Sequence, residues 1–377
     1  MKKILITGGA GFIGSNLALK LLNRGYKVTI LDNLTHQIHG SNPTITSHSY
    51  KSILNKVNFI KGSVTSRKDW VNAIIGQEVI VHLAAETGTG QSMYNIEKYV
   101  QTNINGTSLM LDFLINQKHS IRKIIVASSR AIYGEGKYEC ITHGIVYPKQ
   151  RNDNDLRKGD FNCKCPNCNK DLLLVQTDEN SKILPSSIYG ITKYNQEQMC
   201  LLIGNTLKIP TFALRFQNVY GPGQSLSNPY TGILSIFSTL IKTGKSINIF
   251  EDGKESRDFV YIDDVVDSIL LSIESELFGG TFNVGTGKRV DVLEVAKILV
   301  KKYQIDTDIQ ITGNYRIGDI RHNYADISSI QKYLNYTPKF DFNSGIQNFV
   351  NWVNVQNNLC DSFEQSIREL RNRKMFR

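Results

Sequence analysis

The sequence predicts an α/β fold in which helices cover both faces of a doubly wound parallel sheet, followed by a smaller α+β lobe. Two observations support this prediction. Short apolar runs alternate with helical patterns through the first part of the chain, and a glycine-rich turn joins the first run to the first helix. The chain has 377 residues, of which 41% are hydrophobic, so it can bury a core large enough for a two-lobed protein.

The apolar runs mark strands and the periodic segments mark helices. A strand at 3–7 (KILIT) leads through the glycine turn into a helical pattern at 15–25 and a second buried strand at 27–32. After residue 134 the alternation gives way to a polar stretch rich in Asn, Lys and Cys. The remaining expected elements are strands at 57–60, 78–84, 122–128 and 211–215, and helices at 95–118, 188–205 and 360–374.

The turn after the first strand reads Gly-x-x-Gly-x-x-Gly, formed by Gly8, Gly11 and Gly14. Glycine allows a tight turn that approaches a pyrophosphate, and the following helix N-terminus supplies N–H donors and a positive dipole end. Asp32 ends the second strand, 18 positions after Gly14, where its carboxylate could bind an adenosine ribose and would repel a 2′-phosphate. The pattern therefore predicts a Rossmann-type site for NAD rather than NADP. Without a dinucleotide, these residues would form a tight turn that packs a helix on a sheet, with Asp32 as a strand-end cap.

The stretch SSIYGITK (186–193) places Tyr189 and Lys193 four residues apart, on one face of the expected helix. A free tyrosine has a pKa of about 10 and is a poor base at neutral pH, but a nearby ammonium stabilises its phenolate. Ser129 follows a buried strand in VASSRAIYG (126–134), where its hydroxyl could bond the same sugar oxygen. Because Tyr and Lys at this spacing are common on solvated helix faces, the pair predicts chemistry only together with Ser129.

The glycine spacing, the stretch HLAAE (82–86) and the Ser, Tyr and Lys motifs together resemble the extended short-chain dehydrogenase/reductase family, in its NAD-dependent epimerase/dehydratase branch. The resemblance covers nearly the whole chain. It implies that Ser129 orients the substrate, Tyr189 is the acid/base, and Lys193 holds the ribose and tunes Tyr189. The cofactor contacts that it implies are Gly8, Gly11, Phe12, Ile13, Gly14, Asp32, Asn33, Ser63, Val64, Leu83, Ala84 and Ala85, together with Tyr189 and Lys193.

Two departures from the family pattern bear on function. Relatives that dehydrate nucleotide sugars carry an Asp-Glu pair directly after the catalytic Ser or Thr, whereas this chain has Arg130 and Ala131 there. Alanine transfers no proton and arginine stays protonated, so dehydration is disfavoured, while epimerisation needs only the triad and a retained NAD. Ser63 stands where the family usually has the Asp that meets the adenine, which predicts a weaker or altered adenine contact.

Three stretches match, in order, the family signatures for binding a nucleotide diphosphate sugar: RFQNVYGPGQ (215–224), GKESRDFVYIDD (253–264) and RIGDIRHNYAD (316–326). Two arginines suit a pyrophosphate through forked, charge-assisted hydrogen bonds, and a carboxylate suits the nucleotide ribose. Taken singly, each arginine would more often be a surface ion-pair partner. The substrate-binding residues that the resemblance implies are Thr87, Asn218, Arg257, Arg316, Asp319 and, at a position that limits sugar size in related 4-epimerases, Asn323.

Three stretches, ETGTGQSMY (86–94), SSRAIYGEG (128–136) and RIGDIRHNYAD, resemble the dTDP-L-rhamnose 4-epimerase-like group of this family. That group interconverts the dTDP derivatives of L-rhamnose and 6-deoxy-L-talose, so the resemblance implies an isomerase that works through a transient 4-keto sugar. UDP-sugar 4-epimerase and CDP-sugar 2-epimerase are the first alternatives. A 4,6-dehydratase, a net oxidoreductase and a non-enzymatic NAD-binding redox scaffold follow.

The chain is expected to divide after residue 215. Residues 1–215 form the NAD-binding domain with a Cys-rich insertion at about 136–182, and residues 216–377 form the nucleotide-sugar lobe. A segment at about 245–275 is expected to pack back on the first domain. The insertion separates Ser129 from Tyr189 by 60 positions, many more than in typical relatives.

The insertion contains two short-spaced pairs, Cys140-x-x-His143 and Cys165-x-x-Cys168, separated by 21 residues. This spacing is typical of a structural zinc site, and a metal would organise a loop with little apolar content. Reduced thiols without a metal and a redox role are the alternatives, and Cys163 is an additional thiol. A closed site with four protein ligands has no open position for chemistry, so a structural role is predicted.

The formal net charge of +10 fits either a solvated basic surface or a basic cleft for an anionic small ligand. The positive charge is spread along the chain without a nucleic-acid-binding motif, so nucleic acid is not an expected partner. No stretch approaches the ~20 apolar residues that cross a bilayer, and the N-terminus lacks the pattern of a signal peptide. A cytoplasmic protein without membrane partners is therefore expected. The family resemblance implies a homodimer through helices 95–118 and 188–205.

Overall fold

The computed structural model describes residues 2–228, 230, 232–356 and 363–377. Within these residues, seven strands form one parallel sheet in the order β14-β9-β5-β4-β1-β2-β3. The strand order reverses between β1 and β4, so the sheet is doubly wound, and the predicted fold class is confirmed. Its strands are β1 (Lys3–Thr7), β2 (Lys27–Asp32), β3 (Asn58–Lys61), β4 (Val79–His82), β5 (Lys123–Ser129), β9 (Thr211–Phe216) and β14 (Gly279–Val284).

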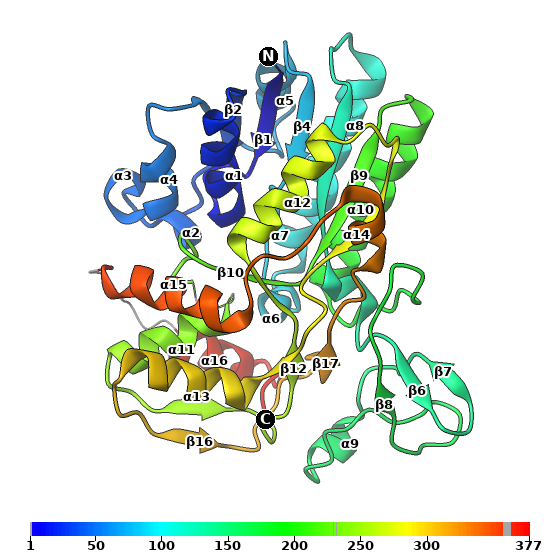
Figure 1. Ribbon diagram of the computed structural model, residues 1–377, viewed down its shortest axis with the longest axis vertical. Coiled ribbons are helices and arrows are strands. Elements are labelled where there is room, and N and C mark those ends of the chain that lie inside the picture. The colour runs from blue at the N-terminus through cyan, green and yellow to red at the C-terminus, as the bar shows by residue number, and fades with distance from the viewer. Residues whose placement is uncertain (1, 229, 231, 357–362) are drawn as a thin grey trace.

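Helices cover both faces of this sheet (Figure 1). Along β1, Ile4 and Ile6 belong to one buried cluster with Leu17, whereas Leu5 belongs to a second cluster with Trp70. This alternation is what a strand buried on both faces requires. The first cluster lies under α1 (Phe12–Asn23) and α12 (Ile262–Glu274), and the second under α5 (Arg67–Ile74), α8 (Gly106–Asn116) and α10 (Ile188–Thr206).

Short helices fill the remaining connections of the first lobe. The helix expected at 95–118 is present as three consecutive pieces, of which the middle one is π-helical. None of the described helices is long and apolar enough to cross a membrane. The short elements are α2 (His36–His39), α3 (Pro43–Thr46), α4 (His48–Ile53), α6 (Thr89–Ser92), α7 (Ile96–Tyr99), the π-helix η1 (Val100–Asn105) and the 3-10 helix η2 (Arg130–Tyr133).

The second lobe combines helices with short strand pairs and lies below the sheet in Figure 1. Its helices are α11 (Ile233–Lys242), α13 (Val292–Tyr303), α15 (Phe342–Asn354) and α16 (Phe363–Asn372). Its strands are β10 (Asn218–Tyr220) with β13 (Phe259–Tyr261), β11 (Ile247–Ile249) with β16 (Ile309–Ile311), and β12 (Ser256–Arg257) between β15 (Val290–Asp291) and β17 (His322–Asn323). Helix α14 (Ser328–Leu334) lies instead beside the large sheet, where it packs against β14 and α12.

The chain returns to the first lobe after β13. Helix α12 packs against α1, and β14 then pairs with β9 as the last strand of the large sheet. The sequence placed the segment after about residue 275 in the second lobe, so this edge strand extends the first lobe beyond the predicted boundary. The terminal helix expected at 360–374 is present as α16, and residues 360–362 lie outside the described part of the chain.

The insertion is a small separate unit beside the second lobe (Figure 1). Its three strands, in the order β7-β6-β8, pair antiparallel. They are β6 (Tyr138–Cys140), β7 (Gly144–Val146) and β8 (Leu173–Leu174), and α9 (Asp153–Leu156) lies in the long connection between β7 and β8.

Candidate active site

A cleft of about 700 Å³ opens at the carboxyl ends of the parallel strands. It lies at the switch point between β1 and β4, where open α/β sheets bind their ligands. Its lining includes Gly8 after β1, Asp32 at the end of β2, Leu83 after β4 and Ser129 at the end of β5. Segments 217–219 and 223–228 of the second lobe complete the lining.

The glycine turn has no room for side chains at two positions. Gly8 has a φ of +67°, and a Cβ there would lie 2.8 Å from the backbone nitrogen of Ala84. A Cβ on Gly14 would lie 2.5 Å from the carbonyl oxygen of Gly8. The turn therefore holds α1 tight against β1, and its glycines place no side chain between the start of α1 and the cleft, which fits a pyrophosphate at the helix N-terminus.

Asp32 braces this turn. Its carboxylate accepts hydrogen bonds from the backbone N–H of Ala10 (3.0 Å) and of Leu34 (2.8 Å). Burial raises the pKa of Asp32, while these hydrogen bonds and the nearby His39 ring act in the opposite direction. Asp32 lines the cleft as well, so the side chain is placed both as a cap of the turn and as an acceptor for a ligand hydroxyl.

Most of the predicted cofactor residues lie together along the cleft. The exception is Ser63, although its neighbours Gly62 and Val64 do line it. The Ser63 backbone N–H donates to a carboxylate oxygen of Asp69 (2.9 Å), and its hydroxyl contacts that of Thr65 (2.8 Å). The cofactor residues that line the cleft are Gly8, Gly11, Phe12, Ile13, Gly14, Asp32, Asn33, Val64, Leu83, Ala84, Ala85, Tyr189 and Lys193.

The fold brings Ser129, Tyr189 and Lys193 together. Ser129 ends β5, and the other two lie in the first turns of α10, whose start is capped by the hydroxyl of Ser187. A Cβ on Gly190 would lie 2.5 Å from the carbonyl oxygen of Ala131, so glycine lets α10 approach the turn after Ser129 closely. All three predicted triad residues line the cleft, and Tyr189 hydrogen-bonds to Ser129.

Burial sets the proton affinities of this group. It raises the pKa of Tyr189, against which the Ser129 hydrogen bond and the Arg130 charge both act. It also lowers the pKa of Lys193 to about 7, because an ammonium is poorly solvated there. The Lys193 ammonium donates to the side-chain oxygen of Gln196 (2.6 Å).

A buried network of hydrogen bonds continues from Lys193 through Gln196 into the core. The Gln196 amide donates to Thr107 Oγ1 (2.9 Å) and contacts the ring of His82 at 3.2 Å. His82 also hydrogen-bonds to the hydroxyl of Thr7 at 2.7 Å. Burial, followed by the Lys193 charge, lowers the pKa of His82 to about 3, so the ring is neutral and adds no competing charge beneath Lys193.

Of the predicted substrate residues, Thr87 and Asn218 line the cleft. Asn218 accepts a hydrogen bond from Arg130 Nε (2.9 Å). Arg257 lies 3.9 Å from Asp319 and donates to backbone carbonyl oxygens around residues 320–321. The Arg130 bond joins the end of β5 to β10, whereas the Arg257 contacts join β12 to residues 319–321 within the second lobe.

The other two predicted substrate residues, Arg316 and Asn323, do not line the cleft, and neither do Arg257 and Asp319. The guanidinium of Arg316 lies 5.0 Å from the ring centroid of Phe250 and 5.9 Å from that of Phe363. Asn323 is buried on β17, and its side-chain amide has no hydrogen-bond partner among the described residues. A Cβ added to Gly136 of the insertion would lie 3.3 Å from this amide.

Comparisons with known proteins agree with this geometry. A sequence model of the "NAD dependent epimerase/dehydratase family" matches residues 4–152 and 168–285. The chain belongs to this family. The match leaves out residues 153–167, which lie within the insertion. Membership confirms the expectation of an NAD-dependent enzyme of the epimerase class.

Individual members of the family are similar over nearly their whole length. A dTDP-L-rhamnose 4-epimerase from Burkholderia thailandensis is 36% identical over 93% of this chain and 95% of its own. A putative UDP-glucose 4-epimerase from Methanocaldococcus jannaschii is 31% identical over 94% and 99%. The crystal structure of UDP-glucose 4-epimerase from Thermotoga maritima, with UDP-glucose, superposes with a TM-score of 0.74 at 28% identity, over 93% and 98%.

In this member of the epimerase/dehydratase family, Arg130 contacts more of the active site than the sequence suggested. The sequence used it only as evidence against dehydration. The structure places it in the cleft lining, with its charge acting on Tyr189 and its Nε bonded to Asn218. Its position next to Ser129 in the sequence could have indicated this role. Its contact with Asn218, however, depends on how β10 packs against the first lobe.

The buried ammonium of Lys193 makes stability depend on pH. Because burial lowers the pKa of Lys193 from 10.5 to about 7, the unfolded chain binds one more proton at this site across that range. Stability contributed by this site therefore rises with pH, by up to about 1.4 kcal/mol per pH unit. K193M lacks this dependence. We therefore expect the unfolding free energy of wild type minus that of K193M to increase from pH 7.5 to pH 9.

Urea unfolding of the NAD-free proteins at both pH values measures this difference. The matched control is K27M, which changes an exposed lysine at the start of β2. If the unfolding free energy of wild type minus that of K193M is the same at both pH values, the pKa of Lys193 is not lowered by burial.

Proposed function

We propose that this protein is an NAD-dependent nucleotide-sugar 4-epimerase whose substrate pair is dTDP-L-rhamnose and dTDP-6-deoxy-L-talose. The observation that carries the proposal is the contact between Ser129 and Tyr189 in one cleft with Lys193 and the glycine turn. The 36% identity to the Burkholderia thailandensis dTDP-L-rhamnose 4-epimerase supports the choice of substrate.

The cofactor is assigned to the first lobe. The turn at Gly8 and Gly14 carries no side chains and suits the pyrophosphate. Asp32 suits the adenosine ribose, and Tyr189 and Lys193 mark the nicotinamide end of the cleft. When bound, NAD supplies the acceptor, and afterwards the donor, of the hydrogen on the sugar carbon that is inverted.

Tyr189 acts as the acid/base. Its phenolate accepts the proton of the sugar 4-hydroxyl as carbon 4 is oxidised, and Ser129 donates a hydrogen bond to the same oxygen in the 4-keto sugar. Once the keto sugar has presented its other face, Tyr189 returns the proton to that oxygen. Arg130 stabilises the phenolate that is present before the first proton transfer and again after the second, and no cofactor is consumed in the full cycle.

The nucleotide sugar is assigned to the cleft between residues 1–215 and residues 216–377. Asn218 and Thr87 line the sugar end, while the Arg130, Arg257 and Asp319 group places positive charge and a ribose acceptor at the second lobe. Arg316 is assigned to the diphosphate, and Asn323 is assigned to the limit on sugar size. Both contacts require the residues that line the cleft to rearrange when the ligand binds.

A UDP-sugar 4-epimerase is the second candidate. The Methanocaldococcus jannaschii relative and the Thermotoga maritima structure support it, because both are named for UDP-glucose. The same triad serves both candidates, so the two differ in the base and sugar that the second lobe accepts.

A homodimer is also proposed, through the helices expected at 95–118 and 188–205. Both helices expose apolar side chains to solvent in the single chain. On α10, Ile191 is 43% and Leu202 is 66% exposed, and on α8, Ile115 is 49% exposed. A paired arrangement of these helices would remove such residues from water.

The proposed function predicts conversion without added cofactor. Purified protein incubated with dTDP-L-rhamnose should produce a second sugar, seen by proton NMR as a new anomeric signal with couplings inverted at carbon 4. The Y189F variant should lose at least about 10³-fold in rate, because general acid–base catalysis contributes of this order, and should still release NAD on denaturation.

UDP-glucose and CDP-sugars are tested in the same way. Turnover of UDP-glucose alone would replace the first candidate by the second. An active Y189F variant would contradict the assigned chemistry whatever the sugar.

The Arg130 charge predicts a shift of the pH profile. Because this charge lowers the pKa of Tyr189, R130Q should raise it, and the rise of kcat/KM with pH should move to higher pH. R130K keeps the charge and should stay close to wild type in this midpoint. If the midpoint is the same in R130Q and wild type, Arg130 does not tune Tyr189.

The dimer predicts a change of mass in solution. L202E would place a charge in the paired helices, so sedimentation should show a monomer at concentrations where wild type is dimeric. I311K changes a side chain of the second lobe that is 55% exposed, and it should leave the dimer intact. A monomeric wild type would refute the proposal.

A further inference from the structure

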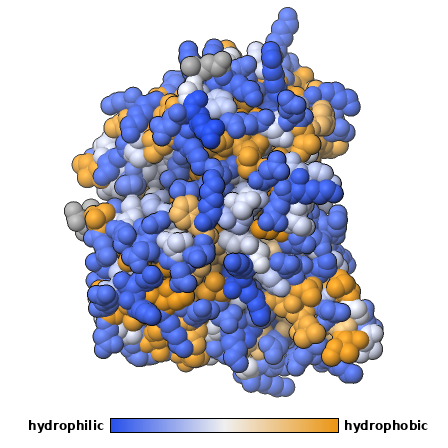
Figure 2. Space-filling model, in the orientation of Figure 1, coloured by the Kyte–Doolittle hydropathy of each residue, from blue (hydrophilic) through white to orange (hydrophobic). Residues whose placement is uncertain are grey.

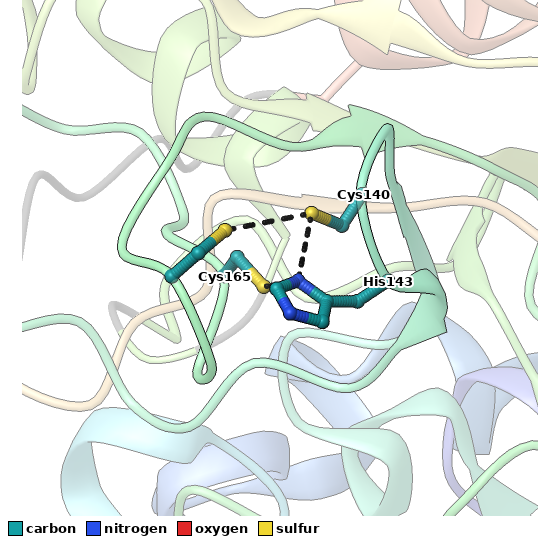
Figure 3. Close-up of side chains that lie close together, drawn as sticks. Cys140, His143 and Cys165 are labelled. Atoms are coloured by element: carbon teal, nitrogen blue, oxygen red, sulfur yellow. Dashed lines mark hydrogen bonds between the residues drawn. The ribbon is translucent and has the colours of Figure 1, made fainter.

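We propose that Cys140, His143, Cys165 and Cys168 bind one zinc ion, and that this ion holds the insertion in place against the second lobe. Among the described residues, these four side chains bring one possible ligand atom each to within 4.8 Å of one another. They come from two loops far apart in the insertion, and Figure 3 shows Cys140, His143 and Cys165 pointing toward a common centre.

Three of the six distances between the ligand atoms match the edges of a tetrahedron around zinc. With Zn–S bonds of about 2.3 Å and Zn–N bonds of about 2.0 Å, such a tetrahedron has S–S edges of about 3.8 Å and S–N edges of about 3.5 Å. The sulfurs of Cys140 and Cys168 are 3.7 Å apart. His143 Nδ1 lies 3.5 Å from the sulfur of Cys140 and 3.6 Å from that of Cys165.

Both ligand pairs sit on tight loops that end in the same backbone conformation. In the first loop, the His143 N–H donates to the Cys140 carbonyl (3.2 Å), and the next residue, Gly144, has a φ of +66°. In the second loop, the Asn169 N–H donates to the Cys165 carbonyl (2.8 Å), and Asn169 itself has a φ of +58°. In each loop the residue after the second ligand takes the left-handed conformation, which glycine and asparagine tolerate best. Two matching turns that aim four ligands at one point indicate a metal site rather than scattered thiols.

The insertion has too little apolar packing to hold itself together. The cluster around the ligands consists of Tyr138, Cys140, Val146, Cys163 and Cys165, and Leu156 and Phe161 form a second small cluster with Tyr315. Other apolar side chains face solvent, since Ile141 is 91% and Leu173 is 58% exposed. Figure 2 shows apolar surface over this unit at the lower right. Metal coordination supplies folding free energy to units that hydrophobic burial alone does not stabilise.

The ligand set selects zinc and a structural role. Three thiolates and one imidazole are typical zinc ligands, and four protein ligands leave no open position for water or substrate. Cys163 is not one of the four clustered ligands and is buried, where desolvation and the nearby Glu135 charge raise the pKa of its thiol. The family match omits residues 153–167, so Cys165 of the second loop lies outside what the family shares.

The insertion is tied to the segment of the second lobe that carries Asp319 and Asn323. Arg151 forms two 2.7 Å hydrogen bonds to the carboxylate of Glu251 and donates to the backbone carbonyl of Asp319 (2.9 Å). Farther along the insertion, the Thr177 N–H donates to the carbonyl of Tyr324 (3.0 Å), and the Asp326 N–H donates to the carbonyl of Thr177 (3.0 Å). Loss of the ion should loosen this segment, and its effect on substrate affinity rests on the function proposed above.

The first test is the metal content of the purified protein by inductively coupled plasma mass spectrometry. We expect about one zinc per chain, lost in C168S and retained in C163S, which changes a neighbouring thiol outside the site. Protein without zinc, zinc retained in C168S, or a Cys140–Cys168 disulfide in freshly purified protein would each overturn the proposal. This measurement does not depend on any enzymatic activity, so it can fail or succeed separately from the proposed function.

The second test removes the ion from wild-type protein with a chelator and needs no variant to fold. Limited proteolysis should then cut within residues 136–182, bound NAD should be unchanged, and the KM for the nucleotide sugar should rise several-fold. Addition of zinc should reverse both changes. Zinc-free protein with an unchanged cleavage pattern would overturn the role of the ion in holding the insertion.

Discussion

The position of helix α10 on the sheet is the constraint on which the active-site geometry depends. A buried ion pair fixes it, because Arg215 of β9 forms two hydrogen bonds to the carboxylate of Glu197 of α10 (2.6 and 3.0 Å). Ser128 donates to the same carboxylate (2.6 Å). Removing one partner of such a buried pair costs about 3–5 kcal/mol, because the other charge stays buried. The helix therefore has one register on the sheet, and that register puts Tyr189 beside Ser129.

Burial gives the groups of the cleft their chemical character. It lowers the pKa of Lys193 and raises those of Tyr189 and Asp32, since each charged form loses water. In such surroundings a nearby cation is weakly screened, so the Arg130 charge acts with the Ser129 hydrogen bond to lower the pKa of Tyr189. A positively charged dinucleotide ring bound nearby would act in the same direction.

The sequence predicted the parts of the site that depend on local patterns. The glycine turn, the end of β5 and the four-residue spacing of Tyr189 and Lys193 follow from strand and helix geometry alone, so their positions were predictable. Pairings between distant segments were not. Nothing local marks β14 as an edge strand of the first sheet, and nothing local places Arg316 beside the stacked rings of Phe250 and Phe363. Such contacts depend on how the lobes pack, which periodicity does not encode.

The structure also explains how a long insertion separates Ser129 from Tyr189 in sequence without separating them in space. The two ends of the insertion are joined, since the Lys137 N–H donates to the hydroxyl of Thr177 (3.1 Å) and the Val175 N–H to the carbonyl of Lys137 (3.4 Å). Once the ends are closed, the residues between them add little further entropy cost to the triad.

The pairing continues outward through β6 and β8 to the proposed zinc ligand Cys140. It continues inward to Thr177, which bridges to Ala325 of the second lobe. The insertion is thus a stem whose outer end carries the proposed metal site. Its inner end is joined to the second lobe at Ala325 and to Asn283 of β14. Because Thr177 lies against the segment that carries Asn323, a change at the metal should reach substrate binding before it reaches the chemistry of Tyr189.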